Sequence, residues 1–246
     1  MDTQKTLMAR LGELATRAAR SGRPSYTRFL DPSEMRLAVY AAGQAGASVK
    51  SWGGYEEAER TVCCFYAGDE PVWEWPFCCL YAKWDQRYAS LTHRDILGSL
   101  MALGMIRETI GDIVVRDGQI FLFALEEMAD YIVLNLIKAG KASLQLHRLS
   151  EVPQMPPPAG KLIRDTVASL RLDAVLAAGY RLSRGDASQA IRDGSVRVNF
   201  MEETRPDALV GAGALLSVRG MGRVRVEQID GPTRKGRIAI VLFRYE

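Results

Sequence analysis

The stretch RLDAVLAAGYRLSRGDASQAIRDGSVRVN, residues 171–199, decides the fold of the C-terminal part of this chain. Apolar residues recur at helical spacing over residues 170–178, which predicts a short helix. Ser183 is followed three positions later by an aspartate, the pattern of a capping box, so a second helix is expected to begin directly after it. Gly194 ends that helix, and residues 195–200 then alternate in the manner of a strand. The stretch therefore predicts two paired helices followed by a strand.

The polar side of the second helix is basic. Arg184, Ser188 and Arg192 follow one another at four-residue steps, which places them opposite the apolar residues. Residues 160–246 contain 15 lysines and arginines against 10 acids, whereas the rest of the chain contains 17 against 19. The net charge of +3 is therefore an average over unlike parts. The C-terminal part is expected to bind a partner of negative charge, such as nucleic acid.

A proline-rich segment separates this basic part from the rest of the chain. Residues 151–160 contain four prolines, which predicts a stiff, extended linker. The length of 246 residues also exceeds that of one typical domain. We therefore predict a multidomain α+β protein, with a small α/β domain over residues 1–75, a second domain over 76–150, the linker, and the basic domain over 161–246.

The N-terminal segment carries signals for both helices and strands. An amphipathic helix is predicted over residues 2–20, and Asp31 followed by a proline predicts the start of a second helix. Residues 47–52 and 61–66 are expected to be strands, and residues 55–60 a short polar helix.

The middle segment has a clearer order of elements. The Asp117-Gly118 turn predicts a hairpin. The expected elements are, in order, a strand over 77–83, a helix over 92–103, hairpin strands over 112–116 and 119–125, a helix over 126–138 closed by Gly140, and a strand over 142–149. This is the order of ferredoxin-like domains, which RNA-recognition (RRM-like) modules also use.

Two phenylalanines of the middle segment allow two interpretations. Phe121 and Phe123 alternate onto one face of their strand and could stack RNA bases. Ile120 and Leu122, on the other face, are equally apolar. Burial of the strand on both faces is therefore favoured.

Few residues are available for catalysis or metal binding. The cysteines form two adjacent pairs, Cys63–Cys64 and Cys78–Cys79, and neighbours on a strand point to opposite faces, so a shared metal ion is not expected. They are interpreted as buried free thiols in a reducing compartment. A nucleophilic pair of Cys79 with His93 stays open on sequence alone.

The sequence gives no positive evidence for an enzyme. Phosphate-loop, zinc-protease and nucleophile-elbow patterns are absent. His93-Arg94-Asp95 is similar to part of a kinase catalytic loop, but capping of a helix by Thr92 and Asp95 explains it better. No apolar run is long enough to span a membrane, and the first twenty residues lack an apolar signal core. We therefore expect a cytoplasmic protein without a metal or cofactor.

The C-terminal segment resembles the S4-type RNA-binding domain of ribosomal proteins, pseudouridine synthases and tyrosyl-tRNA synthetases. The matching residues are Arg171-Leu172-Asp173 with Leu176, Ser183-Arg184 with Ala187 and Ile191, and Gly194, Val196 and Val198-Asn199. Phe200 stands where a glycine is usual, and Gly213-Ala214 where Gly-Asp is usual, so two turns depart from the pattern. The resemblance implies that the paired helices and the adjoining strand present basic residues to structured RNA.

Further stretches resemble the bacterial YlmH family over nearly the whole chain. They are Phe29–Glu34, Gly53-Gly54-Tyr55 with Ala58-Glu59-Arg60, Leu91–Gly98, Leu103-Gly104 with Arg107-Glu108, Ile110–Ile113, Arg219–Arg223 and Thr233–Arg237. The resemblance implies a non-enzymatic RNA-binding protein with a ferredoxin-like middle domain and a C-terminal S4 domain. It also implies a role on the large ribosomal subunit carrying peptidyl-tRNA, in rescue of stalled translation, and a link to cell-division gene clusters.

Arginines are the expected RNA contacts, because a planar guanidinium can bind phosphate oxygens in pairs and stack on bases. The predicted RNA-binding residues are Arg171, Arg184, Arg192, Asn199, Arg219, Arg223, Lys235 and Arg237. Arg94 and Arg107 of the middle segment are weaker candidates. The expected partners are rRNA or tRNA.

Two alternatives stay open on sequence. The triplet Arg171-Leu172-Asp173 superficially matches the catalytic triplet of pseudouridine synthases, which would make the chain an RNA-modifying enzyme. Asp173 would, however, lie on a small binding domain rather than in a cleft. The second alternative is a protein-interaction adaptor linked to cell division, whose basic face contacts acidic partners.

Overall fold

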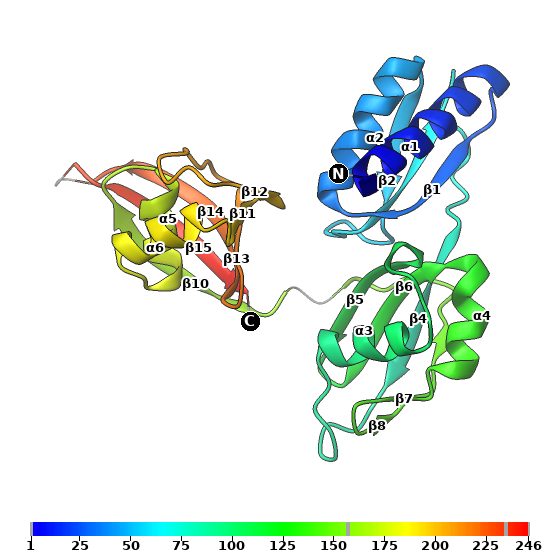
Figure 1. Cartoon of the computed structure of the whole chain (residues 1–246). Coiled ribbons are helices and arrows are strands. Elements are labelled where there is room, and N and C mark those ends of the chain that lie inside the picture. The colour runs from blue at the N-terminus through cyan, green and yellow to red at the C-terminus, as the bar shows by residue number, and fades with distance from the viewer. Residues whose placement is uncertain (1, 156–157, 234–235, 246) are drawn as a thin grey trace. The chain divides into compact units, whose positions relative to one another are not determined.

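The computed structural model describes residues 2–155, 158–233 and 236–245. The chain divides into two compact units, Met1–Pro156 and Pro157–Glu246, which we call unit 1 and unit 2 (Figure 1). Both units combine helices with antiparallel sheets, which confirms the predicted α+β class. The division falls inside the predicted linker. A domain boundary near residue 75 stays a prediction.

Unit 1 begins with a three-stranded sheet covered by two helices. The elements are α1 (Asp2–Ser21), β1 (Ser25–Leu30), α2 (Pro32–Ala45), β2 (Ser48–Trp52) and β3 (Thr61–Tyr66), with sheet order β1-β3-β2. Both helices pack on one face, where Leu11, Ala15 and Phe65 are buried. Their apolar stripes therefore form the core of this part, as the sequence predicted for α1.

Two helix starts follow the predicted capping signals. The Asp31 carboxylate accepts from the Glu34 amide at 2.9 Å, and Glu34 accepts from the Asp31 amide at 2.7 Å. Thr92 and Asp95 make the same reciprocal pair at the start of α3 (His93–Ala102). The capping boxes at both helices are confirmed, which supports capping as the role of the His93-Arg94-Asp95 stretch.

A second sheet of unit 1 has the ferredoxin-like order. Its elements are β4 (Phe77–Lys83), α3, the short 3-10 helix η1 (Arg107–Thr109), β5 (Ile110–Arg116), β6 (Gln119–Leu125), α4 (Glu126–Asn135) and β9 (His147–Arg148). The antiparallel order β5-β6-β4-β9 is that of a split βαβ unit. Helices α3 and α4 cover one face of this sheet around Ile96, Leu100 and Ile132.

Several predicted elements of unit 1 were wrong or missing. Strand β1 was not predicted, because its partner β3 follows more than thirty residues later. Residues 55–60 are turns rather than a helix, since Asp112 binds their backbone amides. Helix α4 ends at Asn135, and Gly140 instead turns a small hairpin between β7 (Lys138–Ala139) and β8 (Ala142–Ser143). The strand expected over 142–149 is reduced to β8 and β9.

The other face of the ferredoxin-like sheet is closed by the N-terminal segment. Phe121 and Phe123 are 5% and 0% exposed, and they pack in a cluster with Phe29 and Val62. The ring of Tyr55 stacks on Phe123 at a centroid distance of 5.4 Å. Burial of these phenylalanines is therefore confirmed, and they offer no platform for RNA bases.

Unit 2 is a six-stranded antiparallel sheet with two helices on one face (Figure 1). Its elements are β10 (Gly160–Val167), α5 (Leu172–Tyr180), α6 (Arg184–Arg192), β11 (Val196–Val198), β12 (Met201–Glu202), β13 (Leu215–Val218), β14 (Gly222–Pro232) and β15 (Ile238–Tyr245). The sheet order is β10-β15-β14-β13-β11-β12. The two predicted helices and the strand after them are confirmed. At the start of α6, Ser183 Oγ accepts from the Asp186 amide at 3.0 Å as predicted, but the Asp186 carboxylate accepts from the Ser183 hydroxyl at 2.7 Å, so the structure shows the N-cap rather than the reciprocal capping box. Strand β10 was not predicted, because it pairs with the distant β15.

Candidate nucleic-acid interface

The starts of α5 and α6 are joined by one carboxylate. Arg184 Nη2 donates to Asp173 Oδ2 at 2.8 Å, and Arg171 donates to the same carboxylate from Nε at 3.3 Å and from Nη2 at 3.2 Å. The side chain of Asp173 is only 7% exposed, whereas those of Arg171 and Arg184 are 41% and 56% exposed. The buried carboxylate therefore holds two arginines in place while their outer faces stay open to solvent.

The charge balance at this point favours an ionised Asp173. Burial alone raises the pKa of the Asp173 carboxyl, but the hydrogen bonds and charges of Arg171 and Arg184 outweigh burial and leave the pKa below its usual value. One negative charge thus stands beside two positive ones. The group carries a net positive charge that a phosphate can approach.

Further predicted arginines lie on α6 and at the β13–β14 hairpin. Arg192 is exposed in the last turn of α6. Shortly after this turn, the carbonyl of Ser195 accepts from the amide of Arg219 at 2.9 Å, so the hairpin tip lies against the end of the helix region. Arg219 is exposed, and Gly220 after it has φ +79°, which shapes the turn. We call Arg171, Arg184 and Arg192 the helix-side arginines.

Asn199 has a structural role in the turn after β11. Its Oδ1 accepts from the Leu215 amide at 2.9 Å, and its own amide donates to the Leu215 carbonyl at 2.8 Å. Asn199 and Phe200 both have positive φ, +50° and +69°. Phe200, which stands where the S4 pattern usually has glycine, therefore keeps the backbone form that glycine would favour. The departure noted in the sequence leaves the turn intact.

The remaining predicted contacts of unit 2 lie elsewhere. Arg223 belongs to β14, on the sheet face away from the helices, with its guanidinium carbon 5.1 Å from the ring centre of Tyr245. Arg237 donates from Nε to Thr166 Oγ1 at 2.9 Å and from Nη2 to the Thr166 carbonyl, which ties β15 to β10. Lys235 lies outside the described residues. Of the eight predicted residues, the structure thus joins Arg171 and Arg184 through Asp173 and places Arg192 on the same helix as Arg184.

The two weaker candidates of the middle segment differ. Arg94 is exposed in the first turn of α3. Arg107 is partly buried and donates to the carbonyls of Ile110 and Gly111 at 2.7 and 3.1 Å. Burial, together with the charge of Arg60, lowers the pKa of Arg107 to about 10. These contacts give Arg107 a structural role at the junction of the two sheets of unit 1.

That junction explains several sequence motifs whose role the sequence did not show. The Asp112 carboxylate accepts from the Tyr55 hydroxyl at 2.8 Å and from the amides of Glu59 and Arg60 at 2.7 and 3.1 Å. Arg60 in turn donates to the carbonyls of Ile110 and Phe29, each at 3.0 Å. The motifs around residues 29, 55–60 and 107–112 therefore meet in one hydrogen-bonded network that fixes the N-terminal segment to the ferredoxin-like sheet.

The cysteines and histidines do not form a reactive site in the described part of the chain. Cys63, Cys64 and Cys79 are buried, Cys78 is half-buried, and all four are free thiols. Burial raises the pKa of Cys63, Cys78 and Cys79 to about 12, so these thiols stay protonated. His93 is exposed at the start of α3, whereas Cys79 lies in the buried aromatic cluster. Within the described ranges, no group of three or more His, Cys, Asp or Glu residues is arranged to hold a metal ion.

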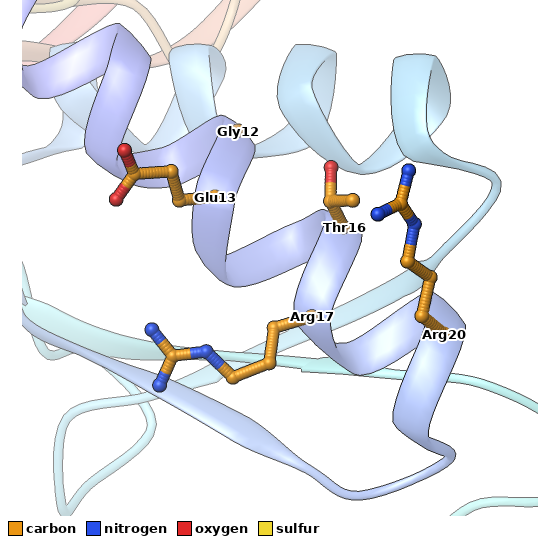
Figure 2. Close-up of a pocket in the computed structure, with 5 residues that line it drawn as sticks. All are labelled: Gly12, Glu13, Thr16, Arg17 and Arg20. Atoms are coloured by element: carbon orange, nitrogen blue, oxygen red, sulfur yellow. The ribbon is translucent and has the colours of Figure 1, made fainter.

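A hollow on α1 does not resemble a ligand site. It has a volume of about 540 Å³ and is lined by Gly12, Glu13, Thr16, Arg17 and Arg20, all from this one helix. Figure 2 shows the side chains of Glu13, Arg17 and Arg20 pointing in different directions. They therefore do not converge on a common ligand. None of the helices among the described residues is long and apolar enough to cross a membrane.

Two paired helices, a strand and a hairpin that present arginines define a protein with an S4 RNA-binding domain. Residues 170–216 match the family described as "S4 domain", and residues 74–152 match "Putative RNA-binding domain in YlmH". The chain is 33% identical over 227 residues to the "Ribosome-associated protein quality control protein P2" of Bacillus subtilis (strain 168), a match that covers 90% of this chain and 88% of the relative. The chain belongs to the YlmH family, which confirms the resemblance found in the sequence.

A solved structure supports the fold. "Cell division protein ylmH from Streptococcus pneumoniae" is similar with a TM-score of 0.51 and 20% identity, over 61% of this chain and 92% of that chain. At this identity the likeness concerns the fold alone.

Proposed function

We propose that this chain is a non-enzymatic, cytoplasmic RNA-binding protein that binds structured rRNA or tRNA through the helix-side arginines. We propose further that it acts on the large ribosomal subunit with peptidyl-tRNA, in rescue of stalled translation. The observation that carries RNA binding is the pair Arg171 and Arg184, held at the starts of two helices by the buried Asp173. The name of the Bacillus subtilis relative supports the step from RNA to the ribosome.

Binding begins with neutralisation of phosphates by the helix-side arginines. Each phosphate contact releases condensed counterions, which makes the affinity strongly dependent on salt. Because Asp173 already fixes two of the guanidinium groups, less side-chain entropy is lost when the RNA binds. A structured RNA with closely spaced phosphates suits this fixed arrangement.

The same geometry argues against a pseudouridine-synthase-like enzyme. A catalytic aspartate must reach the substrate, whereas the Asp173 side chain is 7% exposed and accepts hydrogen bonds from two arginines. The triplet that suggested this alternative is accounted for by helix pairing. We therefore favour binding without catalysis.

The first prediction concerns Arg184→Ala combined with Arg192→Ala in the full chain. The double variant should bind rRNA about ten-fold more weakly, and the slope of log affinity against log salt should become shallower by about two, since each lost phosphate contact removes roughly one unit. Filter binding to purified rRNA between low and moderate salt measures both quantities.

The matched control removes two exposed arginines of unit 1, Arg87→Ala with Arg148→Ala. Each lies beside an acid, at 2.6 Å from Asp85 and 3.2 Å from Asp130. This control loses the same charge and should retain most of the affinity and slope. If the two double variants weaken binding equally, the helix side is not the RNA surface. If neither variant weakens it and the pull-down of cellular partners resists nuclease, the adaptor alternative is correct.

A further inference from the structure

The sheet of unit 2 has a second basic surface, on the face opposite α5 and α6. The register places Arg197 beside Ser217, and Ser217 beside Arg223. In the next row, Arg225 pairs with Phe243. Residues at alternate positions, such as Leu216, Val224 and Leu242, point into the helix-side core, so these polar and aromatic side chains point away from it. We define Arg197, Arg223, Arg225, Phe243 and Tyr245 as the open sheet face.

The aromatic rings of this face lie among guanidinium groups. The rings of Phe243 and Tyr245 meet edge to face, with centroids 5.0 Å apart. The guanidinium carbon of Arg223 lies 5.1 Å from the Tyr245 ring centre. Phe243 also has Gly160 beside it, where a Cβ would come within 2.5 Å of the ring, so the ring lies close to the backbone of β10. Phe243 and Tyr245 are half-buried, so each ring is packed at its side and leaves part of its surface open.

The charge of this surface is positive on balance. Arg225 forms an ion pair with Glu227 at 2.6 Å, and Glu202 is the strand neighbour of Arg197. Arg164 of β10 pairs with Val241 and is exposed on the same face. Further along the same face, Gln228 donates to Asp230 at 2.6 Å. Four arginines therefore face three acids. An anion with flat rings, which is what an unpaired stretch of RNA presents, matches this combination of positive charge and aromatic surface.

We propose that the open sheet face binds unpaired nucleotides of RNA, whose bases stack on Tyr245, Phe243 and the guanidinium of Arg223 while Arg197 contacts the phosphates. The proposal rests on the proposed RNA-binding function and adds a second contact of different chemistry. The helix side contacts the phosphates of structured RNA, whereas the open sheet face takes bases that have left the stack. The residues matched to the S4 family end at 216, so Arg223, Arg225, Phe243 and Tyr245 lie beyond that match.

An apolar protein partner fits this face less well. Val241 and Leu215, which lie on it, are only 8% and 9% exposed, because larger side chains cover them. Leu162, at 58%, is the large aliphatic side chain that the described part of this face leaves open. The accessible surface is therefore made of rings and guanidinium groups rather than of a continuous aliphatic patch.

The test compares two RNA probes on the full chain. One probe is a fluorescent single-stranded oligouridine of about ten nucleotides, a length that single-strand-binding proteins typically cover. The other is a fluorescent RNA hairpin with a fully paired stem and a short loop. Arg223→Ala combined with Tyr245→Ala should weaken binding of the single strand by about ten-fold and leave hairpin binding within about two-fold. Tyr245→Phe keeps the ring and should bind the single strand almost as well as the natural chain.

Controls separate this proposal from the proposed function and from loss of folding. Arg205→Ala removes one exposed charge of unit 2 from the segment whose Pro206 carbonyl accepts from the Asp173 amide, on the α5 side of the sheet, and it should leave single-strand binding unchanged. Amide hydrogen exchange of the β14 and β15 peptides reports whether the variants keep the sheet. Equal single-strand affinity of a folded Arg223→Ala/Tyr245→Ala variant and the natural chain overturns the proposal. An equal loss of affinity for both probes also overturns it, because it would show that this face contributes only positive charge and no stacking of bases. The affinity of Arg184→Ala/Arg192→Ala for the hairpin tests the helix side separately. Either proposal can therefore be contradicted while the other stands.

Discussion

At the residue scale, Asp173 connects the stability of unit 2 with the RNA surface that we propose. Its carboxylate is buried, while the two arginines that it binds are 41% and 56% exposed. The exposed ends of the arginines are screened by water, so the pair of ion contacts contributes less than a fully buried network would. The larger effect of Asp173 is geometric, because it fixes where two guanidinium groups point.

Asp173→Asn should therefore cost unit 2 about 1–2 kcal/mol of unfolding free energy at pH 7. The pKa of Asp173 is lowered in the folded chain, so its contribution is present above the unfolded-state pKa of about 3.9 and is lost as the pH falls through the lower folded value. The difference between the variant and the natural chain should then shrink below about pH 4.

The difference in unfolding free energy can be measured by unfolding both proteins in urea at pH 7 and at pH 3. Amide hydrogen exchange of the α5 and α6 peptides reports the unfolding of unit 2. Tryptophan fluorescence cannot, because Trp52, Trp73, Trp75 and Trp84 all belong to unit 1. A stability difference that is unchanged at pH 3 would show that Asp173 acts through shape rather than charge.

At the scale of elements, two glycines decide how tightly the sheets of unit 1 can meet. A Cβ on Gly111 would come within 2.6 Å of the Phe29 ring and 2.9 Å of Phe123. A Cβ on Gly54 would come within 2.2 Å of Phe123, and its φ of +100° also disfavours any other residue. The aromatic packing of Phe29 and Phe123 on the ferredoxin-like sheet therefore requires glycine at positions 54 and 111.

Gly111→Ala should destabilise unit 1 by about 1–3 kcal/mol, the usual cost of overpacking. Gly12→Ala is the control, since nothing lies within 4 Å of its Cβ in α1, and it should stabilise the helix by about 0.5–1 kcal/mol. Chemical denaturation followed by tryptophan fluorescence compares them. Equal stability of the Gly111 variant and the natural chain would mean that Phe29 and Phe123 are not tightly packed around this position.

The elements also show what the sequence could predict. Local signals located most helices and strands, including the capping boxes of α2 and α3, the Asp117-Gly118 hairpin and the paired helices of unit 2. The missed strands β1 and β10 pair with segments far along the chain, so no local pattern marks their partners. Residues 55–60 carry a helical pattern, but Asp112, over fifty residues away, binds their amides instead.

The same distinction applies to the candidate site. Helical spacing predicted that Arg184 and Arg192 share one side of α6. The shared Asp173 carboxylate and the position of Arg219 near Ser195 depend on how the chain folds back, which spacing does not show. The open sheet face was missed as a surface because its rows run across strands rather than along the sequence.

At the scale of the whole molecule, the two units differ in net charge and in the surfaces that they offer to RNA. Unit 1 has an excess of acids, and its ferredoxin-like sheet is closed by the N-terminal segment, so the aromatic face that RNA-recognition modules use is occupied. Unit 2 carries five surplus positive charges, with 15 basic against 10 acidic residues. We therefore expect RNA to contact mainly unit 2.

Ultraviolet crosslinking of the full chain to purified large ribosomal subunits, with mass spectrometry of the RNA-linked peptides, tests this expectation most directly. RNA-linked peptides should come from α5, α6 and the β13–β14 hairpin, and their yield should fall in Arg184→Ala/Arg192→Ala. Peptides that come only from Met1–Pro156, above all from the strand with Phe121 and Phe123, would contradict it.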